Sequence, residues 1–372
     1  MKEIGFGNLY GRLHNKKEHF PYGGQLELTY RCNLDCVHCF CKGLEEKGKR
    51  LKVKGERLEH RELSTKEWKK ILDIIHREGC LWLTFSGGEP LMREDFLDIY
   101  SYAKSKGFLI TIFTNGQALT SEILDYFSES PPHLIEITLN GITKDTYESI
   151  TQIDGSFEKI MAVLAEIKKR GLRLILKSNC LKQNKDELGK LKQWTEDILG
   201  RPSKKTFYYK YDPMIYPRLD GDKTPCKYRL SFEELQEAKR QDKDIWEEYQ
   251  RGLHSDFPEL KKDKDFLYRC NSWMNQFFIN PYGRLKFCEF SDKFSIDLKT
   301  IPFKEGFYNF PRVLNERFKT DSKCKDCRLR PICYHCPARA YLETGNEEAP
   351  VEYYCKLAKA TSEKMEKGSL AR

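Results

Sequence analysis

The sequence predicts an α/β fold in which a partial (β/α)6 barrel is followed by a smaller, cysteine-rich domain. Two observations support this prediction. Over the first 212 residues, six apolar, β-rich segments alternate with amphipathic helical segments, which favours a parallel sheet with right-handed crossovers. After residue 212, prolines and charged residues become frequent and a second group of cysteines follows, which indicates another unit. A chain of 372 residues is also longer than an ordinary single domain.

Each predicted strand is a short apolar run, and each predicted helix lies between two of these runs. The strands are expected at residues 25–30, 81–85, 109–114, 134–139, 173–179 and 206–211. The helices are expected at residues 64–78, 96–106, 121–128, 157–170 and 185–199. The first helix has the clearest start, because Ser64 is a good N-cap and Glu67 completes a capping box.

The predicted division of the chain has four parts. Residues 1–22 form an N-terminal segment and residues 23–212 the barrel. Residues 213–264 form a linker loop with a helix near 231–252, and residues 265–372 form the second domain, which ends in a helix. Within the barrel, residues 42–60 are dense in Lys, Glu and Gly, so we expect an exposed loop there.

Composition and charge exclude several classes of protein. No apolar stretch approaches the roughly 18–20 residues of a membrane span, and the N-terminus lacks a secretory signal, so a cytoplasmic location is expected. The net charge is +9, but 65 basic and 56 acidic residues are interspersed, so we expect neither a nucleic-acid nor a membrane partner. Fourteen cysteines in such a chain indicate metal binding rather than disulfides.

Three cysteines, Cys32, Cys36 and Cys39, follow the first strand directly. The carboxyl ends of barrel strands are where catalytic groups gather. Three thiolates in one loop can hold three irons of a four-iron cluster and leave the fourth iron open to a ligand from solution. The alternative is a zinc site, in which His38 or Cys41 would supply a fourth ligand.

A second motif, the run 86–90, follows the second strand. The paired glycines Gly87 and Gly88 allow a ligand to lie against bare backbone, because no Cβ intrudes and positive φ is permitted. The carboxylate of Glu89 can hold an ammonium group. The alternative is purely structural, since this order of residues also makes a good turn between a strand and a helix.

Together these two motifs resemble those of the radical S-adenosylmethionine (radical SAM) enzymes, and the resemblance covers residues 26–211. It implies that the open iron binds S-adenosylmethionine, which is cleaved reductively to a 5′-deoxyadenosyl radical that abstracts hydrogen from a substrate. It assigns Gly87, Gly88 and Glu89 to the methionyl amino group. Asn115 and Thr138 match positions that contact the ribose or the carboxylate. The family usually has serine at the position of Thr138 and often aspartate at that of Asn140.

Seven cysteines near the C-terminus resemble the SPASM extension of some radical SAM enzymes, which houses two auxiliary [4Fe-4S] clusters. The resemblance implies a first auxiliary cluster on Cys270, Cys288 and Cys336, and a second on Cys324, Cys327, Cys333 and Cys355. One ligand is missing from the first set; Cys226, another side chain or a substrate group would complete it. The spacing departs from the family, because two residues separate Cys333 from Cys336 where the family usually has three. Two zinc ribbons are the alternative.

The resemblance also implies a substrate class. SPASM-type enzymes mostly modify ribosomally made peptides or protein side chains, by thioether or carbon–carbon crosslinking, epimerisation or oxidation. A tetrapyrrole-type small molecule, or formylglycine formation as in sulfatase maturases, is the enzymatic alternative. The non-catalytic alternative is an iron–sulfur electron relay or scaffold. About 25 residues precede the first strand, too few for a leader-binding module, so the expected partners are a peptide substrate, a separate leader-binding protein and a flavodoxin- or ferredoxin-type electron donor.

The loop after the sixth strand carries the candidates for proton transfer. Asp212, Tyr216 and Asp220 are the predicted catalytic acids or bases, with Arg218 as a further candidate. The alternative for each is an exposed, solvated loop side chain.

Overall fold

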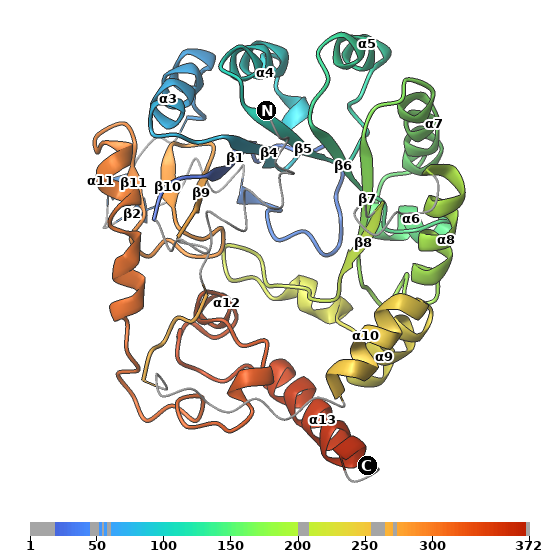
Figure 1. Cartoon of the computed structure of the whole chain (residues 1–372), viewed down its shortest axis with the longest axis vertical. Coiled ribbons are helices and arrows are strands. Elements are labelled where there is room, and N and C mark those ends of the chain that lie inside the picture. The colour runs from blue at the N-terminus through green and yellow to red at the C-terminus, as the bar shows by residue number, and fades with distance from the viewer. Residues whose placement is uncertain are drawn as a thin grey trace, which may run out of the picture.

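The computed structural model describes residues 19–44, 52–53, 56–57, 61–199, 208–253, 265–270 and 274–369. Within these residues the main feature is a nine-stranded sheet of order β11-β10-β9-β1-β4-β5-β6-β7-β8. The sheet curves, and helices α3, α4, α5, α7 and α8 cover its outer face (Figure 1). The loop expected at 42–60 lies mostly outside the described residues, apart from the short strands β2(Lys52–Val53) and β3(Glu56–Arg57).

The predicted strands form the parallel part of this sheet. They are β1(Gly23–Thr29), β4(Trp82–Gly87), β5(Leu109–Thr114), β6(Leu134–Thr138), β7(Leu174–Asn179) and β8(Tyr209–Asp212), and each pairs in parallel with the next. The sheet is not closed, because β8 is an edge and β1 pairs on its other side with β9(Gln276–Ile279). The predicted partial barrel is therefore confirmed.

The helices of the barrel follow the prediction with one addition. They are α3(Thr65–Arg77), α4(Phe96–Ser105), α5(Ser121–Glu129), α6(Lys144–Thr151), α7(Ser156–Lys169) and α8(Leu188–Leu199). The capping box of Ser64 and Glu67 begins α3 as expected. Helix α6 was not predicted, because eight residues are too few for a helical repeat of apolar positions to be clear.

The helix expected near 231–252 is two helices, α9(Phe232–Arg240) and α10(Lys243–Leu253), which follow the 3-10 helix η2(Thr224–Tyr228). The helix is interrupted at Asp242, whose carboxylate accepts a hydrogen bond from the backbone N–H of Ile245 at 3.2 Å. A side chain that caps a new N-terminus ends one helix and begins the next. Periodicity alone did not reveal this break.

The C-terminal segment extends the barrel sheet. Strand β9 lies parallel to β1, and β10(Arg284–Lys286) and β11(Ile296–Asp297) continue it in antiparallel order. The remaining elements are α11(Phe303–Phe307), η3(Phe310–Asn315), η4(Arg330–Ile332), α12(Pro337–Thr344) and α13(Glu352–Ser369). Phe277 of β9 and Leu26 of β1 belong to one hydrophobic core. The sheet thus crosses the expected boundary at residue 265.

The strands of the barrel present two different faces. In β1, Leu26 and Leu28 are fully buried in the core, whereas Gln25 alternates with them and lines an internal cavity. In β6, Ile135 and Ile137 are likewise buried on the core side. Alternate residues of a strand point to opposite faces, so the apolar residues pack against the helices and the polar ones face inward.

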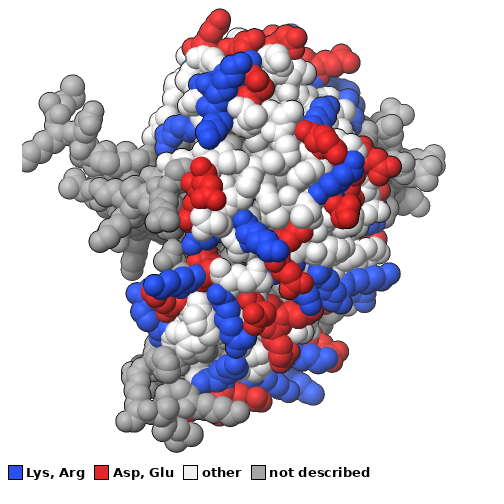
Figure 2. Space-filling model, turned by 90° about the vertical axis from the view of Figure 1, so that its right-hand side faces the viewer, with Lys and Arg blue, Asp and Glu red and all other residues white. Residues whose placement is uncertain are grey.

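The surface mixes charges of both signs. Figure 2 shows acidic and basic side chains interspersed over the visible face, without a broad patch of one sign. Among the helices that the structure describes, none is both long and apolar enough to cross a membrane.

Strands β1 and β4 meet closely at their carboxyl ends. The backbone N–H of Gly88 donates to the carbonyl of Thr29 at 2.8 Å, and that of Glu89 donates to the carbonyl of Arg31 at 2.8 Å. A Cβ on Gly87, whose φ is +132°, would collide with the Thr29 carbonyl, and one on Gly88 would lie 2.5 Å from the Arg31 carbonyl oxygen. The paired glycines are therefore required by the protein's own backbone.

We predict that Gly87→Ala destabilises the protein more than Gly79→Ala. Both glycines have positive φ, but nothing lies within 4 Å of a Cβ built on Gly79, so the control carries only the conformational cost of about 1–2 kcal/mol. Gly87→Ala adds a backbone collision of about 1–3 kcal/mol. Thermal unfolding of both variants measures the difference. Equal midpoints would show that the contact between β1 and β4 is not tight.

Candidate active site

A cavity of about 500 Å³ opens at the carboxyl ends of the parallel strands. Its wall includes residues from the cysteine loop, from the turn after β4 and from the ends of β5 and β6. The predicted cluster and cofactor residues that line it are Cys32, Cys36, Cys39, Gly87, Gly88, Asn115 and Thr138. Residues that are up to 106 positions apart, from Cys32 to Thr138, thus share one space. Ligand sites of open α/β sheets lie at this edge of the strands.

The cysteine loop is held by its backbone against α6. The N–H of Asp35 donates to the carbonyl of Thr151 and that of Val37 to the carbonyl of Ile150, each at 3.0 Å. Burial raises the pKa of the Cys36 and Cys39 thiols, and the charge of the neighbouring cysteines adds to it at Cys36. Burial also raises the pKa of Cys32, to about 11.

Three neighbouring thiols with raised pKa values, which repel one another as thiolates, need a cation before they can ionise readily. A cationic iron centre supplies that charge, so the donor set fits an iron–sulfur cluster. Within the described part of the chain, no group of three or more His, Cys, Asp or Glu side chains has the arrangement needed to hold a single metal ion.

The two candidates for a fourth zinc ligand, Cys41 and His38, each contact residues outside the three-cysteine set. Cys41 is 5% exposed and packs with Tyr30, Leu44 and Tyr282. Burial lowers the pKa of His38 to about 4, so its ring is neutral at physiological pH. Its Nε2 atom lies 3.5 Å from Nδ2 of Asn140.

The carboxylate of Glu89 is surrounded by hydrogen-bond donors of the protein itself. Its carboxylate is fully buried and accepts hydrogen bonds from Thr114 Oγ1 at 2.8 Å, from the Asn115 backbone N–H at 2.7 Å and from the Leu91 backbone N–H at 3.1 Å. Burial raises its pKa to about 7, against the effect of these donors. These hydrogen bonds join the turn after β4 to the end of β5, and the expected contact of Glu89 with the methionyl amino group stays a prediction.

Asn115 continues this connection to the cysteine loop. Its Nδ2 donates to Asn33 Oδ1 at 2.8 Å and lies 3.5 Å from Cys32 Sγ. Thr138 is half-buried on the cavity wall. Asn140, the other position that departs from the family, accepts a hydrogen bond from the Asn179 N–H at 2.8 Å. Its side chain therefore ties the ends of β6 and β7 together.

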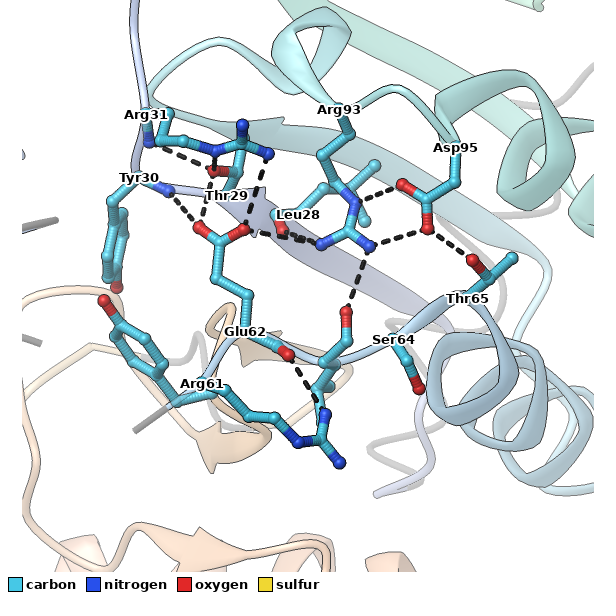
Figure 3. A network of polar contacts seen from close by, with 12 residues as sticks. Leu28, Thr29, Tyr30, Arg31, Arg61, Glu62, Ser64, Thr65, Arg93 and Asp95 are labelled. Carbon is cyan, nitrogen blue, oxygen red and sulfur yellow. Dashed lines mark hydrogen bonds and ion pairs between the residues drawn. The ribbon is translucent and has the colours of Figure 1, made fainter. Parts of the chain in front are cut away.

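A polar network anchors the residues that precede Cys32. Figure 3 shows Glu62 between Arg31 and Arg93, with a hydrogen bond from Thr29 Oγ1 to Glu62 Oε1 of 2.6 Å. Arg93 is 7% exposed, binds Asp95 through two hydrogen bonds of 2.8 Å and donates to the Leu28 carbonyl at 3.1 Å. A bidentate arginine holds both partners in one geometry. Sequence reasoning missed this network, because Glu62 lies in a loop without any motif.

The predicted acid and base candidates divide into two groups. Asp212 and Tyr216 line the cavity, and burial raises the pKa of both groups. Asp220 is exposed, accepts a hydrogen bond from the Asp222 N–H at 2.9 Å and is not part of the cavity wall. Arg218 forms an ion pair with Asp222 at 2.7 Å. Asp220 and Arg218 are thus not among the residues that line the cavity, and their catalytic roles stay predictions.

The seven C-terminal cysteines fall into two electrostatic groups. Burial raises the pKa of Cys288 to about 12, and the charges of Cys336 and Cys270 add to the shift. Burial raises the pKa of Cys333 to about 11, with additions from Cys355, Cys324 and Cys327. These neighbours are the members of the two sets inferred from the sequence. The strongest charged neighbours of Cys226 are Arg229 and Glu343.

Charged residues inside the barrel were not predicted. Glu27 of β1, Glu136 of β6 and Lys177 of β7 are single charges in their strands, and Lys210 lies in β8, which also contains Asp212. A charge inside such a strand was the available signal, because it is costly to bury unless it faces a partner or a polar cavity. Glu289, after β10, lines the same cavity.

The comparisons with known proteins agree with this site. Residues 26–194 match the Radical SAM superfamily. These residues form a radical SAM domain. Over 353 residues it is 26% identical to an AdoMet-dependent heme synthase of Methanosarcina barkeri, covering 88% of this chain and 94% of the relative. Over 168 residues it is 35% identical to a PqqA peptide cyclase of Ruegeria pomeroyi, covering 45% of this chain and 42% of that one.

The fold is shared with a solved structure, Streptococcus suis SuiB bound to its precursor peptide SuiA. The TM-score is 0.65 at 16% identity, over 94% of this chain and 80% of SuiB. Radical SAM enzymes use S-adenosylmethionine and a [4Fe-4S] cluster, and the three-cysteine loop of this chain has the donors for that cluster.

Glu27 generates a pH prediction. Its carboxyl is 2% exposed and accepts a hydrogen bond from Tyr30 Oη at 2.9 Å. Burial, with the charge of Glu289 next, raises its pKa from 4.5 to about 8. The folded state therefore holds a proton between pH 4.5 and 8 that the unfolded state has released.

Stability should consequently fall as pH rises through this window, by up to about 1.4 kcal/mol per pH unit, and level off above pH 8. Glu27→Gln should remove this fall. The measurement is the thermal unfolding midpoint at pH 5.5, 6.5, 7.5 and 8.5, with Glu129→Gln, an exposed glutamate, as control. Parallel profiles for wild type and Glu27→Gln would contradict the assignment.

Proposed function

We propose that this radical SAM protein modifies a ribosomally made peptide or protein side chain, by crosslinking, epimerisation or oxidation. The observation that carries the proposal is the single cavity in which the three-cysteine loop faces the ends of β4, β5 and β6. The shared fold with SuiB, which was solved with a precursor peptide, supports a peptide substrate. The partial match to a peptide cyclase supports it further.

In this proposal each group on the cavity wall has a task. Cys32, Cys36 and Cys39 hold three irons of the cluster, and S-adenosylmethionine on the fourth supplies a 5′-deoxyadenosyl radical after one-electron reduction. The Gly87–Gly88 backbone and Thr138 lie against the bound cosubstrate. Glu89 and Asn115 position this wall through their hydrogen bonds.

Asp212 is the proposed acid or base for the proton that moves after hydrogen abstraction. It stands at the end of β8, lines the cavity and has a raised pKa, which brings a carboxyl group closer to the pH at which it can exchange protons. Tyr216 lies on the same loop and lines the same cavity. Arg339 stacks on its ring at 3.9 Å, so the phenol has a cation beside it.

We also propose two auxiliary [4Fe-4S] clusters in a SPASM-type domain, covering residues 265–372. The two electrostatic groups of cysteines support this division. The cluster on Cys270, Cys288 and Cys336 keeps one iron without a cysteine from its own set. A flavodoxin- or ferredoxin-type donor in the cytoplasm and a separate leader-binding protein complete the proposal.

A second candidate function is modification of a tetrapyrrole. The match to the heme synthase covers 94% of that relative, whereas the match to the peptide cyclase covers 42%. The heme synthase match supports a porphyrin-type substrate, although a second PqqA peptide cyclase, of Bradyrhizobium diazoefficiens, is 23% identical and is covered to 84%. Both candidates require the same radical initiation and differ in what enters the cavity.

Two matched variants test the clusters. Reconstituted wild type should contain about twelve irons on the three-cluster proposal, and Cys36→Ala and Cys327→Ala should each contain about eight. Cys36→Ala should make no 5′-deoxyadenosine after reduction, whereas Cys327→Ala should still make it. Iron analysis and chromatography of the products measure both quantities. About four irons in wild type would refute the auxiliary clusters, and 5′-deoxyadenosine from Cys36→Ala would refute the initiation site.

Turnover identifies the substrate class. We expect a peptide encoded beside the gene to change mass when it is incubated with reduced enzyme and S-adenosylmethionine, because the radical removes hydrogen from it. Iron coproporphyrin is the parallel assay. Mass spectrometry reads both reactions, with Cys36→Ala as control. A mass change of the porphyrin alone would replace the first candidate by the second.

A further inference from the structure

An ionic cluster on three neighbouring strands lies inside the cavity. Glu136 of β6 is 3% exposed, and its two carboxylate oxygens face two different lysines. Oε1 lies 3.2 Å from Nζ of Lys177 on β7, and Oε2 lies 2.6 Å from Nζ of Lys210 on β8. All three residues line the cavity. One carboxylate therefore serves two ammonium groups.

The other acids of the cavity wall interact more strongly with cations outside this cluster than with Lys177. The strongest charge partner of Glu289 is Lys286, with Lys177 behind it. That of Asp212 is Arg339, again with Lys177 behind it. The cluster of Glu136, Lys177 and Lys210, taken by itself, has one carboxylate for two ammonium groups. Burial lowers the pKa of Lys177, and Glu136 opposes this effect, so an added anion would stabilise its ammonium form.

The lysines also have unused hydrogen-bond donors. Each ammonium has three N–H groups, and within the described residues each makes one polar contact, with Glu136. The ring of Phe113 lies below them, 4.0 Å from Nζ of Lys177 and 5.8 Å from Nζ of Lys210. An aromatic face attracts ammonium groups but accepts no strong hydrogen bond. Lys177 is the more buried of the two, with 28% of its side chain exposed against 53% for Lys210, and the remaining donors of both face the cavity or solvent.

The cluster is separate from the wall assigned to S-adenosylmethionine. Glu136 precedes Thr138 by two residues on the same strand, which places it about 7 Å deeper along the barrel. Lys210 belongs to the edge strand β8, on the far side of β6 and β7 from the Gly87–Gly88 turn. A group bound by these lysines would therefore enter the cavity from the β8 side of the sheet, opposite the Gly87–Gly88 turn that follows β4.

We propose that Lys177 and Lys210 form a carboxylate-binding subsite that positions the substrate in the cavity. The carboxylate accepts hydrogen bonds from both ammonium groups and balances the charge that Glu136 leaves over. This inference rests on the proposed function only in placing the substrate in this cavity. An acidic peptide side chain and a porphyrin propionate carry the same chemistry, so the experiment separates these two sources.

The test is a binding measurement on reconstituted full-length protein that is loaded with S-adenosylmethionine. The first pair of probes is the tripeptide Ac-Ala-Glu-Ala-NH2 and its glutamine counterpart. The second pair is coproporphyrin III and its tetra-amide. The variants are Lys177→Met and Lys210→Met, which keep most of the unbranched side chain but remove its charge. Lys159→Met, an exposed lysine on α7, is the matched control.

We expect wild type to prefer at least one acid over its amide, and each cavity variant to lose that preference with at least tenfold weaker binding of the acid. The pair that shows this effect names the source. Lys159→Met should behave like wild type. The affinity for S-adenosylmethionine should not change, because its binding groups are assigned to the Gly87–Gly88 turn, Asn115 and Thr138 rather than to the lysines.

Several outcomes would overturn the subsite. They are equal binding of acid and amide by wild type, an unchanged preference in both cavity variants, or weaker binding of S-adenosylmethionine in those variants. A lower unfolding midpoint with the preference intact would show that the lysines only hold β8 to the sheet. If carboxylate binding is as expected but no substrate is modified, the proposed function fails while the subsite stands.

Discussion

The site depends on the backbone contact between the ends of β1 and β4. The hydrogen bonds from Gly88 to Thr29 and from Glu89 to Arg31 fix the chain at the residue before Cys32. The buried carboxylate of Glu89 then accepts a hydrogen bond from the backbone N–H of Asn115, and the side chain of Asn115 donates to Asn33 in the cysteine loop. A loop that must present three thiols to one cluster has little regular structure of its own, so its geometry comes from these neighbours.

The inside of the barrel is the second constraint. Apolar residues of each strand face the helices, and the alternate positions carry charges into a largely enclosed space. Electrostatic interactions are stronger in such surroundings than in water. The same burial raises the pKa of the cysteine thiols and of Glu27 and leaves two lysines around one carboxylate. A cationic cluster and an anionic substrate group would each relieve part of this cost.

Much of the fold was predictable, because its signals are local. The alternation of strands and helices and the capping box at Ser64 depend on neighbouring residues only. Helix α6 and the break at Asp242 were missed because they are short-range features without clear periodicity. For the site, motif spacing identified Cys32, Cys36 and Cys39. It could not show that the carboxylate of Glu89 is buried among donors of the protein or that Asp220 lies outside the cavity wall. Both depend on the direction of a side chain in the folded protein.

The sequence by itself determined the order of the elements, the partial barrel and the identity of the thiol donors. These follow from hydrophobic period and from residue types at close spacing. Only the tertiary structure decided that β9 lies beside β1, that Asn115 reaches Cys32 and that Glu136 lies between Lys177 and Lys210. Each of these contacts depends on the register of strands that are far apart in the chain. Register is set by the packing of the whole sheet, which no short stretch of sequence contains.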